Sequence, residues 1–186
     1  TGAIGESAGS LFELEYFDLG SAYLAQTGQL YQEAAIMAHR NTFCFGPTFR
    51  AEKSKTRKHL TEFWMLEAEM AYCSHDESLQ LQEDMVVYVV RWCLEQCGDA
   101  LAEVGRDLTP LERAAEGRFE RLLYRDAVKL LQKKGSDIQF GEDLGAPEET
   151  ILGAEFDRPV FVCNYPRAVK AFYMKRNPDD PETVLC

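Results

Sequence analysis

The amino-acid sequence predicts an α+β domain built on a mostly antiparallel sheet that is flanked by helices. Short strand-like segments lie close together along the chain and are joined by hairpin-like turns. Helical patterns come in blocks between these segments, and this order is typical of α+β domains. The chain has 186 residues, of which 46% are hydrophobic, and this suffices for one compact domain with its own core.

The N-terminal part of the chain predicts a hairpin, a helix and a second hairpin. Residues 11–24 favour two short strands around a glycine-containing turn. Residues 29–40 carry apolar side chains and few helix breakers, so a helix is expected there. Residues 43–50 and 62–72 then predict two longer strands, the first with an irregular entry that contains Gly and Pro.

The strand at 62–72 has two different faces, because successive side chains of a strand point to opposite sides. Phe63, Met65, Glu67 and Glu69 share one face, so two carboxylates point at whatever lies over the sheet. The other face is wholly apolar and carries Trp64, Leu66, Ala68 and Met70.

A long amphipathic helix is predicted from Ser74 to Cys97. Ser74 and Glu77 have the spacing of a capping box, which marks a helix start. The apolar side chains along one side of this helix predict a buried stripe. That stripe comprises Leu81, Met85, Val89, Trp92 and Cys93.

The remaining sequence predicts three more helices and two more strands. Thr109 and Pro110 indicate a helix start. Residues 124–134 predict an amphipathic helix that Gly135 closes, and a short helix is expected near 148–152. The last two predicted elements are strands joined by a Tyr-Pro turn, at 159–164 and 170–175.

Composition and charge limit the classes of partner. The net charge is −11, and an acidic chain does not favour a nucleic-acid surface, which needs clustered Lys and Arg. Residues 50–59 are the local exception, because they are rich in basic side chains. The six cysteines form no CxxC pair, which favours reduced thiols in a cytosolic protein. Residues 1–10 lack a signal-peptide pattern, and no apolar stretch could span a bilayer, so a cytoplasmic protein without a membrane partner is expected.

The second predicted hairpin carries the main chemical signal. Its first strand ends at Arg50, and a basic loop leads from there to the second strand. An arginine beside a basic loop suits a polyphosphate ligand, because guanidinium groups bind phosphate through paired hydrogen bonds. From these residues alone, a solvated hairpin turn with scattered charges is the more ordinary interpretation.

Two strings in this hairpin resemble motif 2 of the class II aminoacyl-tRNA synthetases, in particular the aspartyl/asparaginyl subgroup. They are FRAE at 49–52 and HLTEFWMLE at 59–67. The resemblance extends through residues 23–31 and 171–175, and so covers nearly the whole chain. It implies the catalytic core of class II synthetases as the fold. It also implies a reaction in which an amino acid and ATP form an aminoacyl-adenylate.

The resemblance assigns roles around ATP. Arg50 matches the catalytic arginine that holds the α-phosphate and the substrate carboxylate. Glu52 matches the acid that accepts a hydrogen bond from the adenine amino group, and Phe63 matches the aromatic ring that stacks on adenine. The loop segment that touches the ATP phosphates matches Lys58, His59 and Leu60.

The segment at 27–33 favours asparagine over aspartate as the substrate. Aspartyl members carry a Lys that pairs with the side-chain carboxylate of aspartate, and Gln32 stands at that position here. A buried carboxylate without its cation is unfavourable, whereas a neutral amide needs none. Gly28 in place of Pro is also the pattern of the asparaginyl members.

The remaining amino-acid contacts also follow from the resemblance. Glu67 or Glu69 is expected to accept from the amide or ammonium group of the substrate, with help from Gln29. Glu6 matches the acid that binds the ammonium group. Taken without the family, Gln29 and Gln32 indicate an ordinary polar face at a helix start.

The resemblance also implies the domain organisation. Residues 1–186 correspond to part of a catalytic domain, with motif 2 at about 43–72. Motif 1 is expected before Thr1, and motif 3 with the main Mg²⁺-binding acid is expected beyond Cys186, so no metal ligand is assigned within the chain. The anticodon-binding barrel is absent from it. The implied cofactors and partners are ATP, Mg²⁺, asparagine, tRNA(Asn) and a second copy in a homodimer.

We expect the chain by itself neither to adenylate asparagine efficiently nor to charge tRNA. Other functions remain open from the sequence. An aspartyl-tRNA synthetase, or an asparagine synthetase derived from one, would use the same fold on aspartate, and Gln32 argues against both. A non-catalytic remnant that binds nucleotide is the third alternative, although Arg50, Glu52 and Phe63 are all retained.

Overall fold

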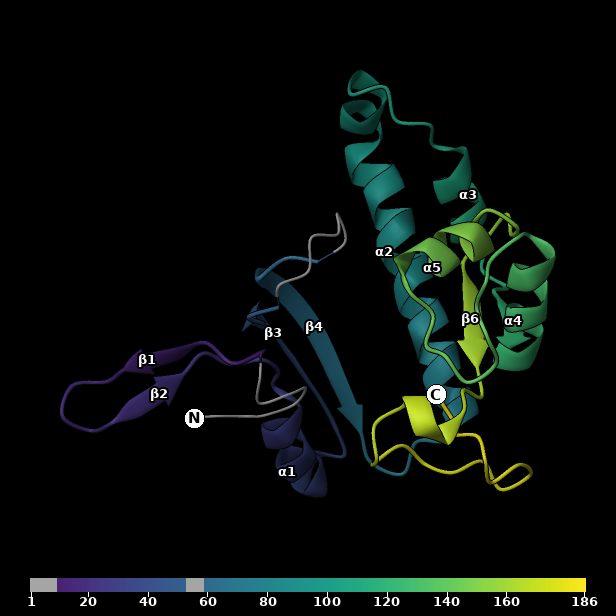
Figure 1. Ribbon diagram of the computed structural model, residues 1–186. Helices are drawn as coiled ribbons and strands as arrows, with labels where there is room; N and C mark the ends of the chain where they lie inside the picture. The colour runs from purple at the N-terminus through teal and green to yellow at the C-terminus, as the bar shows by residue number, and fades with distance from the viewer. Residues whose placement is uncertain (1–9, 53–58) are drawn as a thin grey trace. The chain divides into compact units, whose positions relative to one another are not determined.

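The computed structural model describes residues 10–52 and 59–186, and the chain divides into two compact units after Cys73 (Figure 1). Unit 1 consists of two antiparallel hairpins with a helix between them. Its elements are β1 (Glu13–Glu15), β2 (Ser21–Tyr23), α1 (Gln29–His39), β3 (Asn41–Phe49) and β4 (Glu62–Met70). All five predicted elements of this region are therefore confirmed.

The β3–β4 hairpin has one covered and one exposed face. In its register Cys44 lies opposite Glu67, and Thr42 lies opposite Glu69. These side chains are on the less exposed face, and α1 contacts both strands. On the other face Phe45 and Trp64 are each 63% exposed, with ring centroids 5.1 Å apart. The alternation predicted for 62–72 is thus correct, and the face with the carboxylates is the one that α1 meets.

Unit 2 begins with a long helix. Shorter helices and two strands, which form a small parallel sheet, follow it along the chain. Its elements are α2 (His75–Glu103), α3 (Thr109–Ala115), β5 (Glu120–Leu123), α4 (Tyr124–Lys133), α5 (Ala146–Gly153), β6 (Val160–Cys163) and the 3₁₀ turn η2 (Arg167–Val169). The Ser74–Glu77 capping box forms at the start of α2, and proline lies in the first turn of α3. Gly135 follows α4 with φ of +92°, a conformation that favours glycine.

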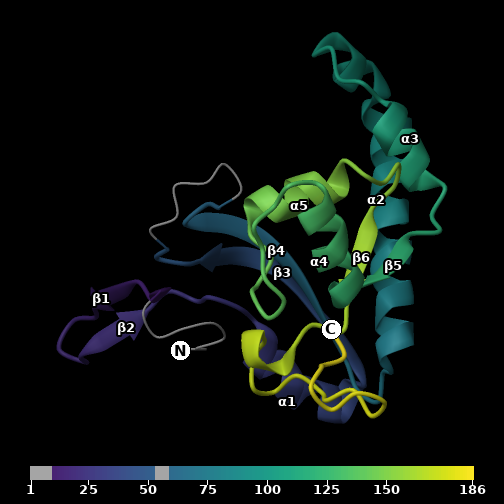
Figure 2. The same cartoon turned by 45° about the vertical axis from the view of Figure 1, so that its right-hand side comes forward.

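In unit 2 helix α4 lies beside β6 (Figure 2), and the core of this unit forms around α4. Its buried residues are Tyr124, Ala127, Val128, Leu131, Ile138 and Leu152. The hydroxyl of Tyr124 donates to the carbonyl of Glu142 at 2.6 Å and accepts the backbone N–H of Gly141 at 3.0 Å. A fully buried tyrosine thereby keeps its polar group satisfied while its ring fills the core.

The prediction of a buried stripe on α2 is wrong for four of its five residues, and the fifth, Cys93, is partly buried. Leu81, Met85, Val89 and Trp92 are 40–52% exposed, whereas Leu79 is buried at 5%. The helix packs instead through a neighbouring stripe, from which Glu83 accepts the backbone N–H of Arg118. Apolar residues occur on more than one side of this helix, and long-range partners decide which side is covered.

Two further differences concern strands. The predicted strand at 170–175 is absent, and the N–H of Met174 instead closes a turn onto the carbonyl of Ala171 at 3.1 Å. The carbonyl of Lys175 accepts the N–H of Leu185 at 2.8 Å, but the segment joins no sheet in the described part of the chain. Conversely β5, which the sequence did not predict, pairs in parallel with β6, with Leu123 beside Cys163.

Within residues 10–52 and 59–186, no helix combines the length and the apolar character that a membrane crossing requires.

Candidate functional site

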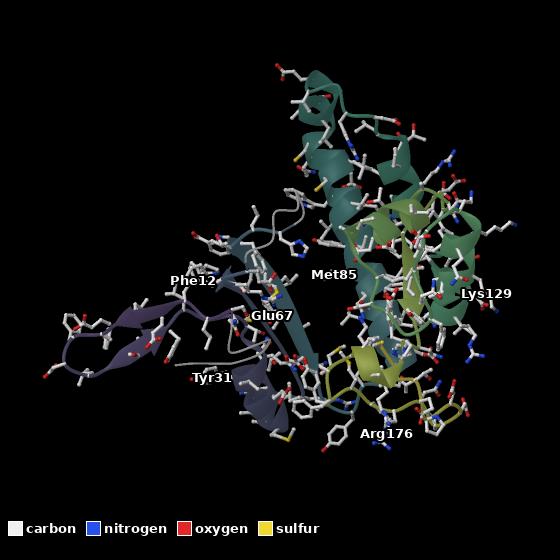
Figure 3. The ribbon with its side chains drawn as sticks, viewed as in Figure 1. Phe12, Tyr31, Glu67, Met85, Lys129 and Arg176 are labelled. Carbon is white, nitrogen blue, oxygen red and sulfur yellow. The ribbon has the colours of Figure 1, made fainter. Side chains whose placement is uncertain are left out.

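Glu67 of β4 is the centre of a hydrogen-bond network at the start of α1 (Figure 3). Its carboxylate accepts the hydroxyl of Thr27, and it accepts the backbone N–H of Gly28 at 2.8 Å. The thiol of Cys44 donates to the same carboxylate, with 3.4 Å between Sγ and Oε2. A negative group at this position also benefits from the partial positive charge of the first helical turn.

The space and the hydrogen bonding at the start of α1 suit Gly28. A Cβ atom at this position would lie 2.5 Å from Sγ of Cys44, which is closer than real contacts allow. Its N–H also donates to Glu67, and a proline would supply no such donor. Glycine at position 28 thus supplies a hydrogen bond to the carboxylate that proline could not.

Gln32 is buried, with 6% of its surface exposed, and both ends of its amide are bonded within the protein. Its Nε2 donates to Sγ of Cys44 at 3.2 Å, and its Oε1 accepts the hydroxyl of Thr42 at 3.3 Å. An ordinary solvated helix face is therefore excluded for this residue. Gln29, by contrast, is partly exposed, and its amide donates to Glu33 at 3.0 Å.

The environment of this network is acidic. Burial raises the pKa of Glu69 above its ordinary value, and the charges of Glu33 and Glu67 raise it further. The sequence contains no Lys or Arg before Arg40, so β1, β2 and α1 bring no such side chain to this face. The arrangement favours ligand groups that donate hydrogen bonds or carry positive charge, and it disfavours a carboxylate.

Arg50 and Phe63 lie together where β4 begins. The guanidinium carbon of Arg50 stands 5.4 Å from the ring centroid of Phe63, and one of its nitrogens approaches Sδ of Met65 at 3.9 Å. Glu67 lies four positions along the strand from Phe63, a distance of about 13 Å. One face of the hairpin thus carries a cation and an aromatic ring towards one end, and carboxylates towards the other.

The other predicted residues are spread around this hairpin. Glu52, His59 and Leu60 are exposed between β3 and β4, where the chain passes from one strand to the other, and Leu60 is 68% exposed. Glu6 and Lys58 lie outside the described residues. Groups of three or more His, Cys, Asp or Glu that could hold a metal ion do not occur among the residues that the structure describes, so no residue is assigned to Mg²⁺.

Sequence reasoning missed Thr27 and Cys44 as members of the network. Thr27 lies inside the segment that the resemblance singled out, so its position was a signal. Strand alternation places Cys44 on one face of 43–50, but only the register brings it opposite Glu67.

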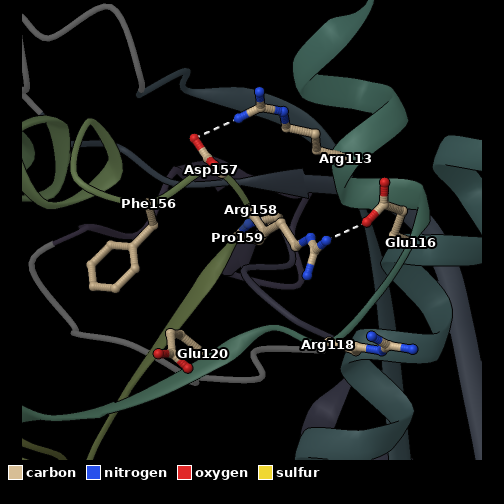
Figure 4. A pocket seen from close by; sticks show the side chains of 8 residues that line it. All are labelled: Arg113, Glu116, Arg118, Glu120, Phe156, Asp157, Arg158 and Pro159. Carbon is tan, nitrogen blue, oxygen red and sulfur yellow. Dashed lines mark hydrogen bonds and ion pairs between the residues drawn. The ribbon is translucent and has the colours of Figure 1, made fainter.

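Unit 2 has a separate pocket of about 420 Å³ at the end of α3 (Figure 4). Arg113 pairs with Asp157 at 2.5 Å, and Arg158 pairs with Glu116. Its lining holds as many acidic as basic side chains, so the charges balance and favour neither an anion nor a cation. The lining comprises Arg113, Glu116, Arg118, Glu120, Phe156, Asp157, Arg158 and Pro159.

Comparison with known protein families gives one match that spans almost the whole chain. The family described as tRNA synthetases class II (D, K and N) matches residues 2–185. Asparagine–tRNA ligase of Lactobacillus delbrueckii subsp. bulgaricus is 55% identical over 181 residues, and that of Roseiflexus sp. is 52% identical over 187 residues. Each alignment covers 97% of this chain, and the chain spans 42% of the length of these curated relatives.

Solved structures of an asparaginyl-tRNA synthetase and an aspartyl-tRNA synthetase also match this chain. The asparaginyl-tRNA synthetase of Pyrococcus horikoshii, complexed with asparaginyl-adenylate, matches with a TM-score of 0.90 and 46% identity. That alignment covers 96% of this chain and 41% of the other. The aspartyl-tRNA synthetase of Entamoeba histolytica matches with a TM-score of 0.71 and 30% identity, over 87% of this chain and 35% of its own.

Proposed function

The chain belongs to the class II tRNA synthetases (D, K and N), and we propose that it is part of an asparagine–tRNA ligase. The complete enzyme would activate asparagine with ATP and transfer it to tRNA(Asn). In this proposal residues 1–186 belong to the catalytic domain, with motif 2 at about 43–72. The enzyme acts in the cytoplasm as a homodimer.

The observation that carries the proposal is the buried, neutral Gln32 within an acidic network. Its amide is bonded to Cys44 and Thr42, and the carboxylates of Glu67 and Glu69 lie on the neighbouring strand. The side-chain carboxylate of aspartate would be repelled here, because bringing a charge out of water without a partner of opposite sign is unfavourable. The amide of asparagine instead offers N–H donors to carboxylates.

The chemistry of activation assigns roles to the other end of the hairpin. The carboxylate of asparagine attacks the α-phosphorus of ATP, an O–P bond forms, and pyrophosphate leaves with the electrons of the broken P–O bond. Arg50 holds the α-phosphate and stabilises the negative charge that accumulates there. The ring of Phe63 offers a face to adenine. Glu52 and the loop residues assigned by the resemblance, which are Lys58, His59 and Leu60, would contact the nucleotide. When bound, Mg²⁺ would neutralise phosphate charge.

The test is ATP–pyrophosphate exchange by the full-length protein that carries this sequence, with asparagine and aspartate in parallel. Exchange with asparagine alone is the expected result. Exchange with aspartate would overturn the proposal in favour of an aspartyl enzyme or an asparagine synthetase derived from one. Absence of exchange with both, although ATP still binds, would favour a nucleotide-binding remnant.

A variant sharpens the test at the residue that carries the argument. Gln32→Lys should reduce kcat/KM for asparagine by about tenfold or more, because it breaks both amide hydrogen bonds and brings a cation into the network. Gln82→Lys on the exposed surface of α2 is the matched control, and it should leave the exchange rate unchanged. Equal activity of the two variants would contradict a role for Gln32.

A further inference from the structure

We propose that Cys44 is a positioning residue for asparagine recognition, because its thiol fixes the carboxylate of Glu67 and the amide of Gln32 relative to each other. The inference rests on the proposed function and deepens it by naming a residue that orients the side chains proposed to bind asparagine. It starts from the register of the hairpin, in which Cys44 on β3 lies directly opposite Glu67 on β4.

The sulfur of Cys44 joins a helix residue to a strand residue. Sγ accepts Nε2 of Gln32 at 3.2 Å and donates to Oε2 of Glu67 at 3.4 Å. The hydroxyl of Thr42 donates to Oε1 of Gln32, which orients the amide so that its N–H group points at the sulfur. The donors therefore run in one direction, from Thr42 through Gln32 and Cys44 to Glu67.

The chain of hydrogen bonds ends on a carboxylate that keeps room for the substrate. Glu67 accepts from Thr27 on one oxygen, and from Gly28 and Cys44 on the other. An ionised carboxylate offers about four acceptor positions, so one remains for an N–H of the ligand. Three fixed donors leave the carboxylate little freedom to rotate, and this pre-organisation favours binding.

Packing and ionisation both keep the thiol in this role. The backbone of Gly28 lies so close to Sγ that a single added Cβ would stand 2.5 Å from it. Burial, together with Glu67, raises the pKa of the Cys44 thiol above its ordinary value. The group consequently remains a neutral S–H donor at physiological pH, where a thiolate would repel Glu67.

The experiment compares Cys44→Ala and Cys44→Ser in the full-length protein by ATP–pyrophosphate exchange. Cys44→Ala should raise KM for asparagine by about tenfold, the effect of losing a hydrogen bond to a charged group, with KM for ATP unchanged. Cys44→Ser keeps a donor and an acceptor and should recover most of this loss. Cys93→Ala on α2 is the matched control and should behave as the unmodified protein.

A second measurement does not depend on turnover. The rate at which iodoacetamide alkylates each cysteine can be measured by mass spectrometry. Asparagine should slow the alkylation of Cys44, and it should not slow the alkylation of Cys93. Wild-type exchange together with an unchanged KM in Cys44→Ala, or equal alkylation with and without asparagine, would overturn the role of Cys44 alone. Absence of asparagine-dependent exchange in the wild type would instead overturn the proposed function.

Discussion

At the scale of single residues, the site is organised by hydrogen bonds that converge on one carboxylate. Glu67 receives a hydroxyl and a backbone N–H from the turn before α1 and a thiol from β3, and Gln32 is bonded at both ends of its amide. Charge-assisted hydrogen bonds of this kind are stronger than neutral ones and fix geometry. In the proposed function, specificity for an amide over a carboxylate would thus depend on side chains that also hold α1 to the hairpin.

Glu69 makes a pH-dependent contribution to stability at this scale. Burial is the largest cause of its raised pKa, followed by Glu33 and Glu67. The folded state therefore binds its proton more tightly than the unfolded state, so stability from this group is present below its ordinary value of 4.5 and is lost as pH rises through the folded pKa. Glu69→Gln should raise the melting temperature near neutral pH, and this gain should vanish towards about pH 4.

Thermal unfolding of the full-length protein at several pH values checks this prediction. Glu62→Gln is a suitable control, because Glu62 is exposed at the start of the same strand. A melting temperature of Glu69→Gln below that of the wild type at neutral pH would contradict the expected direction of the effect.

At the scale of elements, helix ends and ion pairs are the features that define the local structure of unit 2. The hydroxyl of Ser74 accepts the N–H of Glu77 at 3.3 Å, and the carboxylate of Glu77 accepts the N–H of Ser74 at 2.8 Å. These bonds satisfy donors that have no partner within the helix. The loop before β6 is tied to α3 by Arg113 with Asp157 and by Arg158 with Glu116.

Loss of the α2 cap should have a measurable cost. Ser74→Ala removes the acceptor for Glu77 N–H and should destabilise the protein by about 1 kcal/mol. Ser78→Ala lies one turn further inside the same helix, where alanine is a good helix former, and should change stability far less. Urea unfolding of both variants measures the difference, and equal effects would argue against the capping role.

The ion pair between α3 and the loop before β6 should contribute little. The side chains of Arg113 and Asp157 are 45% and 81% exposed, so solvent screens their attraction. A double-mutant cycle with Arg113→Gln and Asp157→Asn should give a coupling free energy of about 0.2–1 kcal/mol that declines with added salt. A coupling of several kcal/mol that is independent of salt would show that the pair is less hydrated than its exposure indicates.

At the scale of the whole molecule, each unit combines a packed region with exposed apolar faces. In unit 2 the packed region is the cluster around α4, in which Tyr124, Ala127 and Leu131 are fully buried. In unit 1 the exposed face includes Phe43 at 73% and Phe45 at 63%, and in unit 2 Tyr88 of α2 is 70% exposed. Large apolar patches of this kind usually mark surfaces that meet other protein.

The α4 cluster should dominate the stability of unit 2. Leu131→Ala leaves a cavity at a fully buried position and should cost about 2–5 kcal/mol. Leu123→Ala at a position that is 43% exposed makes the same chemical change and should cost about 1 kcal/mol or less. Urea unfolding with tyrosine fluorescence measures both, and a small effect at Leu131 would mean that the cluster is not a cooperative core.

The sequence by itself determined the local features that depend on near neighbours, and the residues of the family motif. The capping box at Ser74, the glycine after α4 and the alternation along 62–72 all depend on neighbours within a few positions, and the structure has each of them. The strings at 49–52 and 59–67 indicated the family in the same way, because their residue types are read directly from the chain. The roles of Arg50, Glu52 and Phe63 stay predictions.

Only the tertiary structure decided how these parts meet. The register of the hairpin places Cys44 opposite Glu67. Packing covers a different side of α2 from the predicted one. Strand β5 pairs in parallel with β6. The segment at 170–175 has strand-like residues and still forms a turn. Periodicity states which side chains share a face, whereas partners that are distant in sequence determine which face is covered and which strand has a neighbour.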